Sequence, residues 1–339
     1  MELRIPIEKK DLKRYCFEQD IFGKFIYIGC TSLSLVQWHP FDVASTIEDG
    51  YISVFISVSS GWTQKLSQKI FGSSKAQQAQ QAKKISYPPS QDYLGNKTVF
   101  ANSDASESNL SSNGGIKICE SQVSGFTDVS EIQVEFLTND EVARKGGQNA
   151  FVSYESGDLI ISGLQDSMPK YVIENEVAIL VCGGTGIAPM ISIIKYFIRN
   201  IGNKKKIENL KNIYLVWSIK KYYYLGLLEE LLAEIISRDL QSLVKIFVHY
   251  TGDYSLTSAQ LVPQNFFNRL PNISSQFVRI IPGRNDVYSL LEAATTENPG
   301  CTYGLTAVGP NLLVRNARRT TTAWNRSSPF MLKVNYYEG

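Results

Sequence analysis

The C-terminal half of the chain alternates short apolar runs with amphipathic stretches. Buried strands are expected at residues 177–181, 212–217, 243–249 and about 301–308. Helices are expected at 188–200, 224–237 and near 287–294, with a last one from about Asn311. Strands separated by helices predict a parallel sheet, in which ligands bind beyond the carboxyl ends of the strands.

The N-terminal part has a different pattern. Residues 23–59 contain short β-rich runs at 24–28 and 51–58 between turn residues, without a helical period of useful length. This pattern predicts a small barrel or sandwich. The segment WTQKLSQKIF at 62–71 has its apolar side chains near one helical face, so a single helix is expected after the strands.

A change of composition follows from residue 73 to about 147, where Gln, Ala, Ser, Asn and Gly dominate. We interpret this part as a flexible insertion, with a short solvated helix as the alternative for its Gln and Ala run. The apolar stretches 115–119 and 131–137 are expected to be strands of the surrounding domain. The chain is thus predicted to form an all-β domain of residues 1–170 and an α/β domain of residues 171–339.

The segment VAILVCGGTGIAPMISIIKYF at 177–197 carries the most specific local pattern. An apolar strand breaks on Gly183, Gly184, Thr185 and Gly186, and an apolar helix resumes around Pro189. Glycines let the backbone approach a pyrophosphate, and the following helix offers free N–H groups to the anion. A membrane span is the alternative interpretation, but glycines and a proline in its middle would free backbone groups in lipid. A glycine turn without a ligand is a second alternative.

Composition narrows the functional classes. A chain of 339 residues with 43% hydrophobic residues is globular, and its net charge of +2 gives no reason to expect a nucleic-acid partner. The five cysteines are scattered, which favours a reducing compartment. Two histidines are too few to ligate two b-type haems, no metal-ligating cluster is evident, and the N-terminus has no signal peptide. By itself the chain is expected to be soluble.

Four motifs occur together and in a fixed order. They are QWHPFDVAS at 37–45, GWTQKL at 61–66, CGGTGIAPM at 182–190 and AVGP at 307–310. In residue identity, order and spacing they resemble the C-terminal, FAD- and NAD(P)H-binding half of the ferric reductase and NADPH oxidase family. Within that family the closest likeness is to fungal metalloreductase-like or NADPH oxidase-like members. The resemblance covers most of residues 23–337. It implies a ferredoxin reductase-like flavin barrel, here incomplete at its N-terminus, followed by the nucleotide-binding domain.

The resemblance implies a FAD site in the first domain. Its expected residues are His39, Pro40, Phe41, Asp42, Ser45, Gly61, Trp62 and Thr63. Asp42 departs from the family, which prefers a hydroxyl there. An ionised carboxylate only accepts hydrogen bonds and would oppose negative charge on reduced flavin. Asp42 is therefore expected to be protonated, to be turned away, or to weaken the flavin chemistry.

The resemblance also implies an NADPH site in the second domain. Its expected residues are Gly183, Gly184, Thr185, Gly186, Pro189, Ser218, Lys220, Arg284, Gly309 and Pro310. The cations Lys220 and Arg284 suit a 2′-phosphate, which favours NADPH over NADH. Val308 stands where the family has a cysteine near the nicotinamide. Tyr337 is the candidate for the aromatic residue that stacks on the flavin, unless a short tail is missing.

The expected function is a flavin-dependent oxidoreductase module that passes electrons from NADPH through FAD to a haem-containing membrane domain or subunit. Family members reduce ferric or cupric ions, or oxygen to superoxide, at the plasma membrane or endoplasmic reticulum, and this module would face the cytosol. In the family, six membrane helices with two haems precede this half, and they are absent from the sequence. The alternatives are a truncated or degenerate nucleotide-binding module and a soluble NAD(P)H-flavin reductase.

Overall fold

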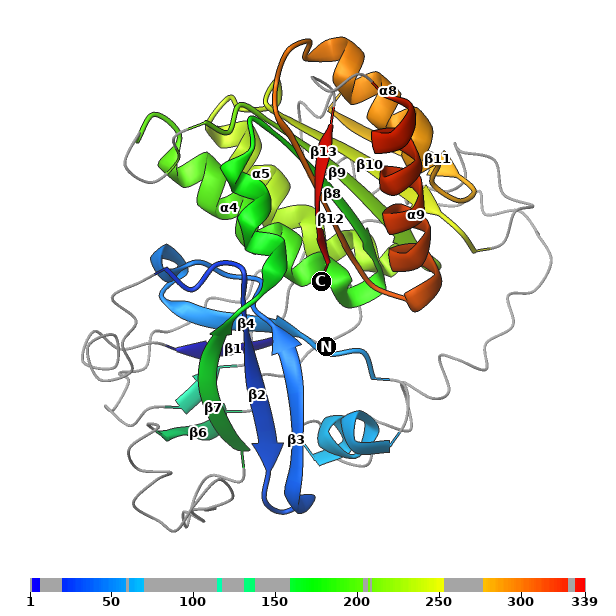
Figure 1. Cartoon of the computed structure of the whole chain (residues 1–339). Helices are drawn as coiled ribbons and strands as arrows, with labels where there is room; N and C mark the ends of the chain where they lie inside the picture. The colour runs from blue at the N-terminus through cyan, green and yellow to red at the C-terminus, as the bar shows by residue number, and fades with distance from the viewer. Residues whose placement is uncertain are drawn as a thin grey trace, which may run out of the picture.

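The computed structural model describes residues 2–6, 20–58, 61–69, 115–117, 131–137, 159–203, 207, 209–252, 277–328 and 333–338. These residues form a β domain and an α/β domain that lie one below the other in Figure 1. Most of the insertion expected at 73–147 falls outside the described residues. Two strands within it are described, β5 (Gly115–Lys117) and β6 (Glu131–Leu137), and they confirm the two expected strands.

The α/β domain is built on one parallel sheet. Its strands are β8 (Val177–Gly183), β9 (Asn212–Ile219), β10 (Val244–Tyr250), β11 (Val278–Pro282), β12 (Tyr303–Val308) and β13 (Val334–Glu338). Their order in the sheet is β11-β10-β9-β8-β12-β13, and every neighbouring pair is parallel. Strands β9, β10 and β11 thus follow one another on one side of β8, and β12 and β13 lie on its other side.

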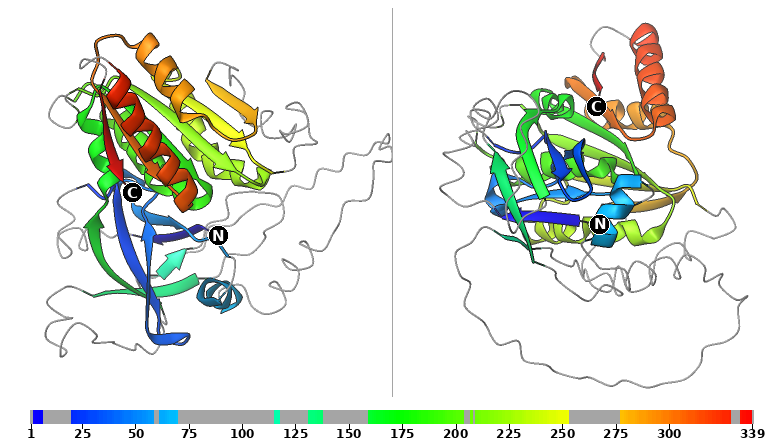
Figure 2. Two further views of the ribbon diagram at one scale, coloured as in Figure 1. Left: turned by 45° about the vertical axis from the view of Figure 1, so that its right-hand side comes forward. Right: turned by 90° about the horizontal axis from the view of Figure 1, so that it is seen from below.

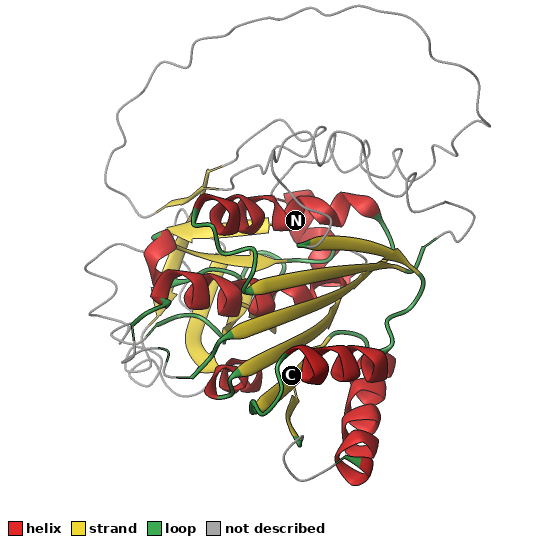
Figure 3. Cartoon of the chain, turned by 90° about the horizontal axis from the view of Figure 1, so that it is seen from above, coloured by secondary structure: helices red, strands yellow, loops and turns green. Residues whose placement is uncertain are grey.

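Helices cover both faces of this sheet, as Figure 3 shows from above. They are α4 (Ala188–Asn200), α5 (Glu229–Ser237), α8 (Val287–Glu297) and α9 (Asn311–Ser327). Side chains of α4 and α5 form one apolar core with the sheet, and those of α8 and α9 form a second core on the opposite face. Strand β8 is fully buried between the two cores, which explains its continuous apolar run.

The β domain contains two sheets. Their strands are β1 (Glu2–Pro6), β2 (Lys24–Cys30), β3 (Ser34–Asp42), β4 (Tyr51–Phe55) and β7 (Leu159–Asp166), together with β5 and β6. The larger sheet has the order β3-β2-β7-β6-β5, and β1 pairs with β4. A bridge between Val43 and Val54 connects β4 to the end of β3, and β1 lies against β5. The two sheets thus curve around one core into the expected barrel.

The sequence patterns missed or misjudged some elements. Residues 222–228 form a 3₁₀ segment, η4 (Tyr222–Leu228), so the helix expected at 224–237 becomes regular only at α5. Five strands were not expected: β3 and β7, which flank β2 in the barrel, and the shorter strands β1, β11 and β13. Strands β1, β11 and β13 are five residues long, and β11 ends in Pro282, which an edge strand tolerates. The helix expected at 62–71 is present over residues 61–69.

The two domains meet along α4. The ring of Phe22 stacks on Tyr196 with centroids 3.7 Å apart, and the Gly23 N–H donates to Ser192 Oγ at 3.1 Å. Between the domains the chain passes through η2 (Met168–Glu174). Figure 2 shows the same arrangement from two further sides, with the end of β13 close to the junction in its left view. Among the described residues, no helix has the length and apolar character needed to cross a bilayer.

Candidate functional site

The two glycine motifs of the α/β domain lie side by side at the carboxyl edge of the sheet. Strands β8 and β12 are neighbours, and Cys182 pairs with Val308 just before both strands end. The chain leaves β8 toward β9 and leaves β12 toward β13, so this is the point where the strand order reverses. In open α/β sheets, ligands bind outside the carboxyl ends at such a switch point.

Gly186 makes the close approach between these two motifs possible. A Cβ on Gly186 would lie 2.7 Å from the Val308 carbonyl oxygen, a distance that real Cβ contacts do not reach. Gly309 and Pro310 follow Val308, and Pro310 begins α9 by accepting the Leu313 N–H at 2.8 Å. The glycine loop is therefore held against the start of α9 by backbone packing.

Gly184 is positioned differently. Its φ of 57° lies in the left-handed region, and a Cβ built on it would meet no atom within 4 Å. Its carbonyl oxygen accepts the Trp217 Nε1–H at 2.9 Å, which fixes the loop to the end of β9. Thr185 is half-buried beside it in η3 (Gly184–Ile187), and Pro189 stands in the first turn of α4. The loop thus presents open space in front of a helix N-terminus, as a phosphate cradle requires.

A row of buried polar atoms follows the same edge, and none of them has a hydrogen-bond partner among the residues that the structure describes. It consists of Ser218 Oγ, His249 Nδ1 and Asn285 Nδ2. The register places Ser218 opposite both Gly183 and His249, and Asn285 lies just beyond the end of β11. Buried polar groups are normally paired, so the polar atoms of this row can bind a ligand. Ser218 was expected from the sequence. His249 was missed because it belongs to no motif, and Asn285 was missed because only Arg284 of the segment at 283–287 was taken as a binding residue.

Burial sets the charge state of the histidine in this row. It lowers the pKa of His249 below its ordinary value, against a smaller opposite effect of a hydrogen bond with the backbone of Gly283. The imidazole is therefore neutral at physiological pH and brings no charge to the site. The positive charge comes instead from Lys220 and Arg284, which are exposed at the ends of β9 and β11. Cations at these ends suit a phosphate.

The two flavin motifs of the barrel also come together. The His39 ring stacks on Trp62 with centroids 4.3 Å apart, and Phe41 lies 6.4 Å from the same indole. Pro40 stands between them, exposed on β3. His39 Nε2 and Trp62 Nε1 are buried and have no hydrogen-bond partner in the described part of the chain. Residues far apart in the sequence thus form one aromatic cluster with two unused polar atoms.

Other expected flavin residues are placed as follows. Gly61 begins the helix over residues 61–69, and Thr63 is half-buried in its first turn. Ser45 is fully buried, and its hydroxyl accepts the Ser53 N–H at 2.9 Å. Tyr337 lies on β13, where its hydroxyl accepts a hydrogen bond from Asn175 Nδ2 at 3.1 Å. The roles of these residues in cofactor binding stay predictions.

Asp42 is the last residue of β3 and is half-buried. Burial raises the pKa of its carboxyl to about 6. The carboxyl therefore titrates close to neutrality, and a protonated fraction persists at pH 6 and below. At pH 7 a carboxyl with this pKa is still mostly ionised, so protonation of Asp42, one of the states expected from the sequence, applies only at about pH 6 and below.

Comparison with known proteins shows which protein family the chain resembles. Residues 175–322 match the family model described as "Ferric reductase NAD binding domain", and residues 5–92 match "FAD-binding domain". "Ferric reductase transmembrane component 1" of Schizosaccharomyces pombe is 24% identical over 302 residues. The α/β domain of this chain is thus a ferric reductase-type NAD-binding domain. This confirms the resemblance read from the four motifs, and with it the cofactors FAD and NADPH and the barrel followed by an α/β domain.

The family likeness is shared with a plant oxidase and concerns only part of the relatives' length. "Respiratory burst oxidase homolog protein B" of Arabidopsis thaliana is 23% identical over 243 residues. The matches cover 87% and 68% of this chain but only 43% of the fission-yeast protein and 22% of the plant protein. Among solved structures, a ferredoxin NADP+ reductase from Neisseria gonorrhoeae with bound FAD and NADP gives a TM-score of 0.44 at 11% identity, covering 100% of this chain and 98% of that one.

The residues present fit both cofactors. The α/β edge combines an open glycine loop, a helix N-terminus, unpartnered buried polar atoms and two cations, which are the groups a phosphorylated dinucleotide needs. The barrel offers an aromatic cluster with two unused polar atoms, which suits a flat heteroaromatic ligand.

Proposed function

We propose that the chain is the electron-input module of a flavin-dependent oxidoreductase, which takes electrons from NADPH and delivers them to a haem-containing membrane domain or subunit. Bound FAD supplies the chemistry, because it accepts a hydride from NADPH and can release electrons one at a time. The observation that carries the proposal is the row Ser218, His249 and Asn285 beside the open Gly184 loop.

The chain's own residues have the task of binding and orientation. The backbone around Gly184 and the N–H groups that begin α4 would hold the pyrophosphate of the dinucleotide. Ser218 and Asn285 would donate to its polar groups, and the unpaired Nδ1 of neutral His249 would accept from them without adding charge. Lys220 and Arg284 would meet the 2′-phosphate and thereby select NADPH.

The barrel would hold the second cofactor through its aromatic cluster. Trp62 stacks on His39, which keeps both rings in place and leaves one N–H and one ring nitrogen available to a ligand. The N-terminus of the helix over residues 61–69 would face an anionic group. Val308, which stands where the family has cysteine, brings no reactive group, so its role is confined to shaping the loop against Gly186.

The final acceptor of the whole protein is part of the same proposal. We propose that it is a ferric or cupric ion or oxygen, reached through the haem-containing membrane domain or subunit; one relative is named as a ferric reductase component and the other as an oxidase homologue. The module would then sit on the cytosolic side of the membrane that carries its partner. A degenerate module that binds nucleotides without turnover is the second candidate, favoured by the buried carboxyl of Asp42.

The test is FAD-dependent reduction of ferricyanide, a one-electron acceptor, by the purified chain with NADPH. The proposal predicts turnover that needs added FAD and that falls strongly in the Trp62→Ala variant. Trp324→Ala is the matched control, because Trp324 is a buried residue near the C-terminal end of α9, away from both expected cofactor sites. A folded chain that binds NADPH but never reduces ferricyanide would support the degenerate module instead.

A further inference from the structure

Charged side chains form a continuous network across the junction of the two domains. Arg199, at the end of α4, donates from Nη2 to Asp49 Oδ1 at 2.8 Å and from Nη1 to Thr46 Oγ1 at 2.6 Å. Lys195, one turn earlier, lies 3.3 Å from the same Asp49 oxygen. Asp49 ends the short 3₁₀ turn η1 (Ile47–Asp49) of the barrel, and its other oxygen accepts the Thr46 N–H at 2.8 Å.

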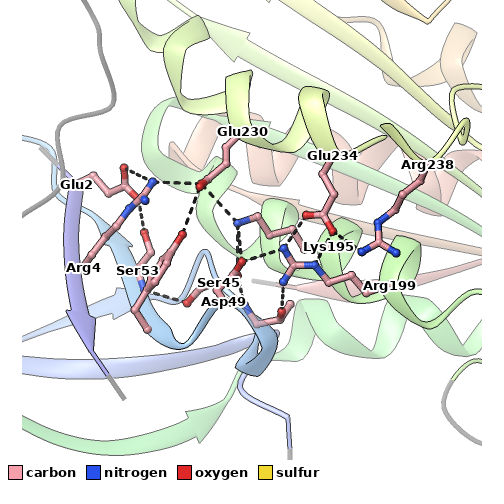
Figure 4. Close-up of polar contacts among 12 residues, drawn as sticks. Glu2, Arg4, Ser45, Asp49, Ser53, Lys195, Arg199, Glu230, Glu234 and Arg238 are labelled. Carbon is pink, nitrogen blue, oxygen red and sulfur yellow. Dashed lines mark hydrogen bonds and ion pairs between the residues drawn. The ribbon is translucent and has the colours of Figure 1, made fainter. Parts of the chain in front are cut away.

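The network continues on both sides of this carboxylate, as Figure 4 shows. Within the α/β domain, Glu234 of α5 binds Arg199 with both oxygens, at 2.7 and 2.6 Å. Glu230, one turn earlier on α5, accepts from Arg4 of β1 at 3.1 Å. The contacts that cross between the domains thus include Arg199–Asp49, Arg199–Thr46, Lys195–Asp49 and Arg4–Glu230.

The central part of the network is shielded from water. The side chains of Asp49 and Lys195 are 7% and 5% exposed. Removing charges from water is costly, so a buried ion pair contributes more to a defined geometry than to stability. The two hydrogen bonds from Arg199 to the Glu234 carboxylate allow the guanidinium little rotation, because both lie in the guanidinium plane.

Both ends of the network lead directly to a cofactor site. Helix α4 starts at the glycine loop, so Arg199 is rigidly connected to Gly184 through three turns of helix. The turn η1 follows β3, which carries His39 and Phe41, with only Val43 to Thr46 between them. An apolar contact holds the same faces together, since Phe22 stacks on Tyr196 of α4, but stacked rings can slide and tilt.

We propose that Asp49 is a positioning residue for hydride transfer: by holding Arg199 and Lys195 it fixes the angle between the two domains at which the nicotinamide meets the flavin. This inference rests on the proposed function and adds to it the device that sets the transfer geometry. Asp49 contacts neither cofactor site itself. A small misplacement of reacting groups lowers a rate by up to about 100-fold, whereas binding of the separate cofactors is unaffected.

The test compares Asp49→Asn with the wild type and with Lys245→Gln, which removes an ion pair lying wholly within the α/β domain. Asparagine keeps the size of the side chain and one oxygen for the Thr46 N–H. The expected result has three parts: roughly 10- to 100-fold slower anaerobic flavin reduction by NADPH, loss of the NADPH–flavin charge-transfer absorbance, and a broadened interdomain distance distribution in small-angle scattering. FAD occupancy and 2′,5′-ADP affinity stay at wild-type values.

A wild-type reduction rate together with a wild-type scattering curve in Asp49→Asn would overturn the proposal. Asp49→Glu, which restores the charge, is expected to recover part of the rate, a result that a merely structural role does not predict. If Asp49→Asn does not fold, Arg199→Lys replaces it, because lysine keeps the charge but loses the two-oxygen contact with Glu234. If the wild type itself is not reduced by NADPH, the proposed function fails while the scattering comparison still decides the orientation.

Discussion

Arg199 Nη2 lies 2.8 Å from Asp49 Oδ1, and the same guanidinium is held by both oxygens of Glu234. Arg199 thus joins the turn η1, which follows β3, to the helix α4, which follows the glycine loop. Because the two partners are 150 residues apart, this contact exists only in the folded protein with both domains in place.

The Asp49 contacts predict a particular response to acid. Burial alone would raise the pKa of this carboxyl, but the Arg199 hydrogen bond, the Lys195 charge and the Thr46 N–H outweigh it and hold the pKa below 3.8. A lowered folded-state pKa contributes stability above the unfolded value and loses it as pH falls through the folded one. Asp49→Asn should therefore cost about 1–3 kcal/mol at pH 7, and this difference should shrink below about pH 4.

The measurement is denaturant unfolding of the wild type and of Asp49→Asn between pH 3 and pH 7. Lys245→Gln, which changes an exposed pair, is the control and should stay within about 0.5 kcal/mol of wild type throughout. A stability difference between wild type and Asp49→Asn that increased on acidification would contradict the predicted decrease.

Asp42 predicts the opposite pH response. Burial raises the pKa of its carboxyl to about 6, so between about pH 4 and pH 6 the folded chain holds a proton that the unfolded chain releases. Stability therefore falls as pH rises through this window, by up to about 2–3 kcal/mol. Asp42→Asn should be more stable than wild type at pH 7 and equal to it near pH 4, as measured by unfolding at both values. Equal stability at pH 7 would mean that the carboxyl is solvated.

The same position offers a test in the flavin site. Asp42→Thr restores the hydroxyl typical of the family and removes the acceptor-only group, so we expect higher FAD occupancy or faster flavin reduction. Comparison with Asp42→Asn separates the loss of charge from the gain of a hydroxyl. If neither variant alters occupancy or rate, Asp42 does not lie at the flavin.

Gly184 predicts a loss of NADPH binding without a loss of folding. Asparagine tolerates a left-handed backbone, so Gly184→Asn keeps the turn and places a side chain in the open space before α4. NADP+ affinity, measured by calorimetry, should fall at least about tenfold, or 1.4 kcal/mol. Gly202→Asn is the matched control, because Gly202 has a φ of 82° and equally open surroundings at the other end of α4. Equal losses in both variants would argue against a phosphate site at Gly184.

The coenzyme preference should depend on Lys220 and Arg284. Replacing both with alanine removes two cations that would meet the 2′-phosphate, so the ratio of kcat/KM for NADPH to that for NADH should fall by roughly tenfold or more. The value for NADH itself should change little. Lys245→Ala, at the start of β10, is the control. An equal decrease with both coenzymes would show that the cations bind something other than the 2′-phosphate.

The sequence predicted the parts of this protein that depend on local patterns. The run from Val177 to Asn200 was predictable, because a fully buried strand must be apolar and a tight loop needs glycine. The observed helix α4 has the expected bounds. The aromatic cluster was predicted as two separate motifs. Its assembly depends on barrel curvature, which the alternation of side chains does not encode.

The remaining features depend on contacts between distant segments. Asp49, Lys195 and Arg199 look like ordinary charged residues of a turn and a helix, and only the docking of the two domains buries them. His249 resembles a residue of any amphipathic strand until the register places it beside Ser218. Neither relationship leaves a periodic signal in the sequence.

The most direct test of the central claim is the visible spectrum of the purified chain with FAD, recorded before and after anaerobic addition of NADPH. The account predicts protein-bound flavin absorbance that bleaches on addition of NADPH. A folded chain that binds no flavin, or that binds flavin which stays oxidised with excess NADPH, would contradict it.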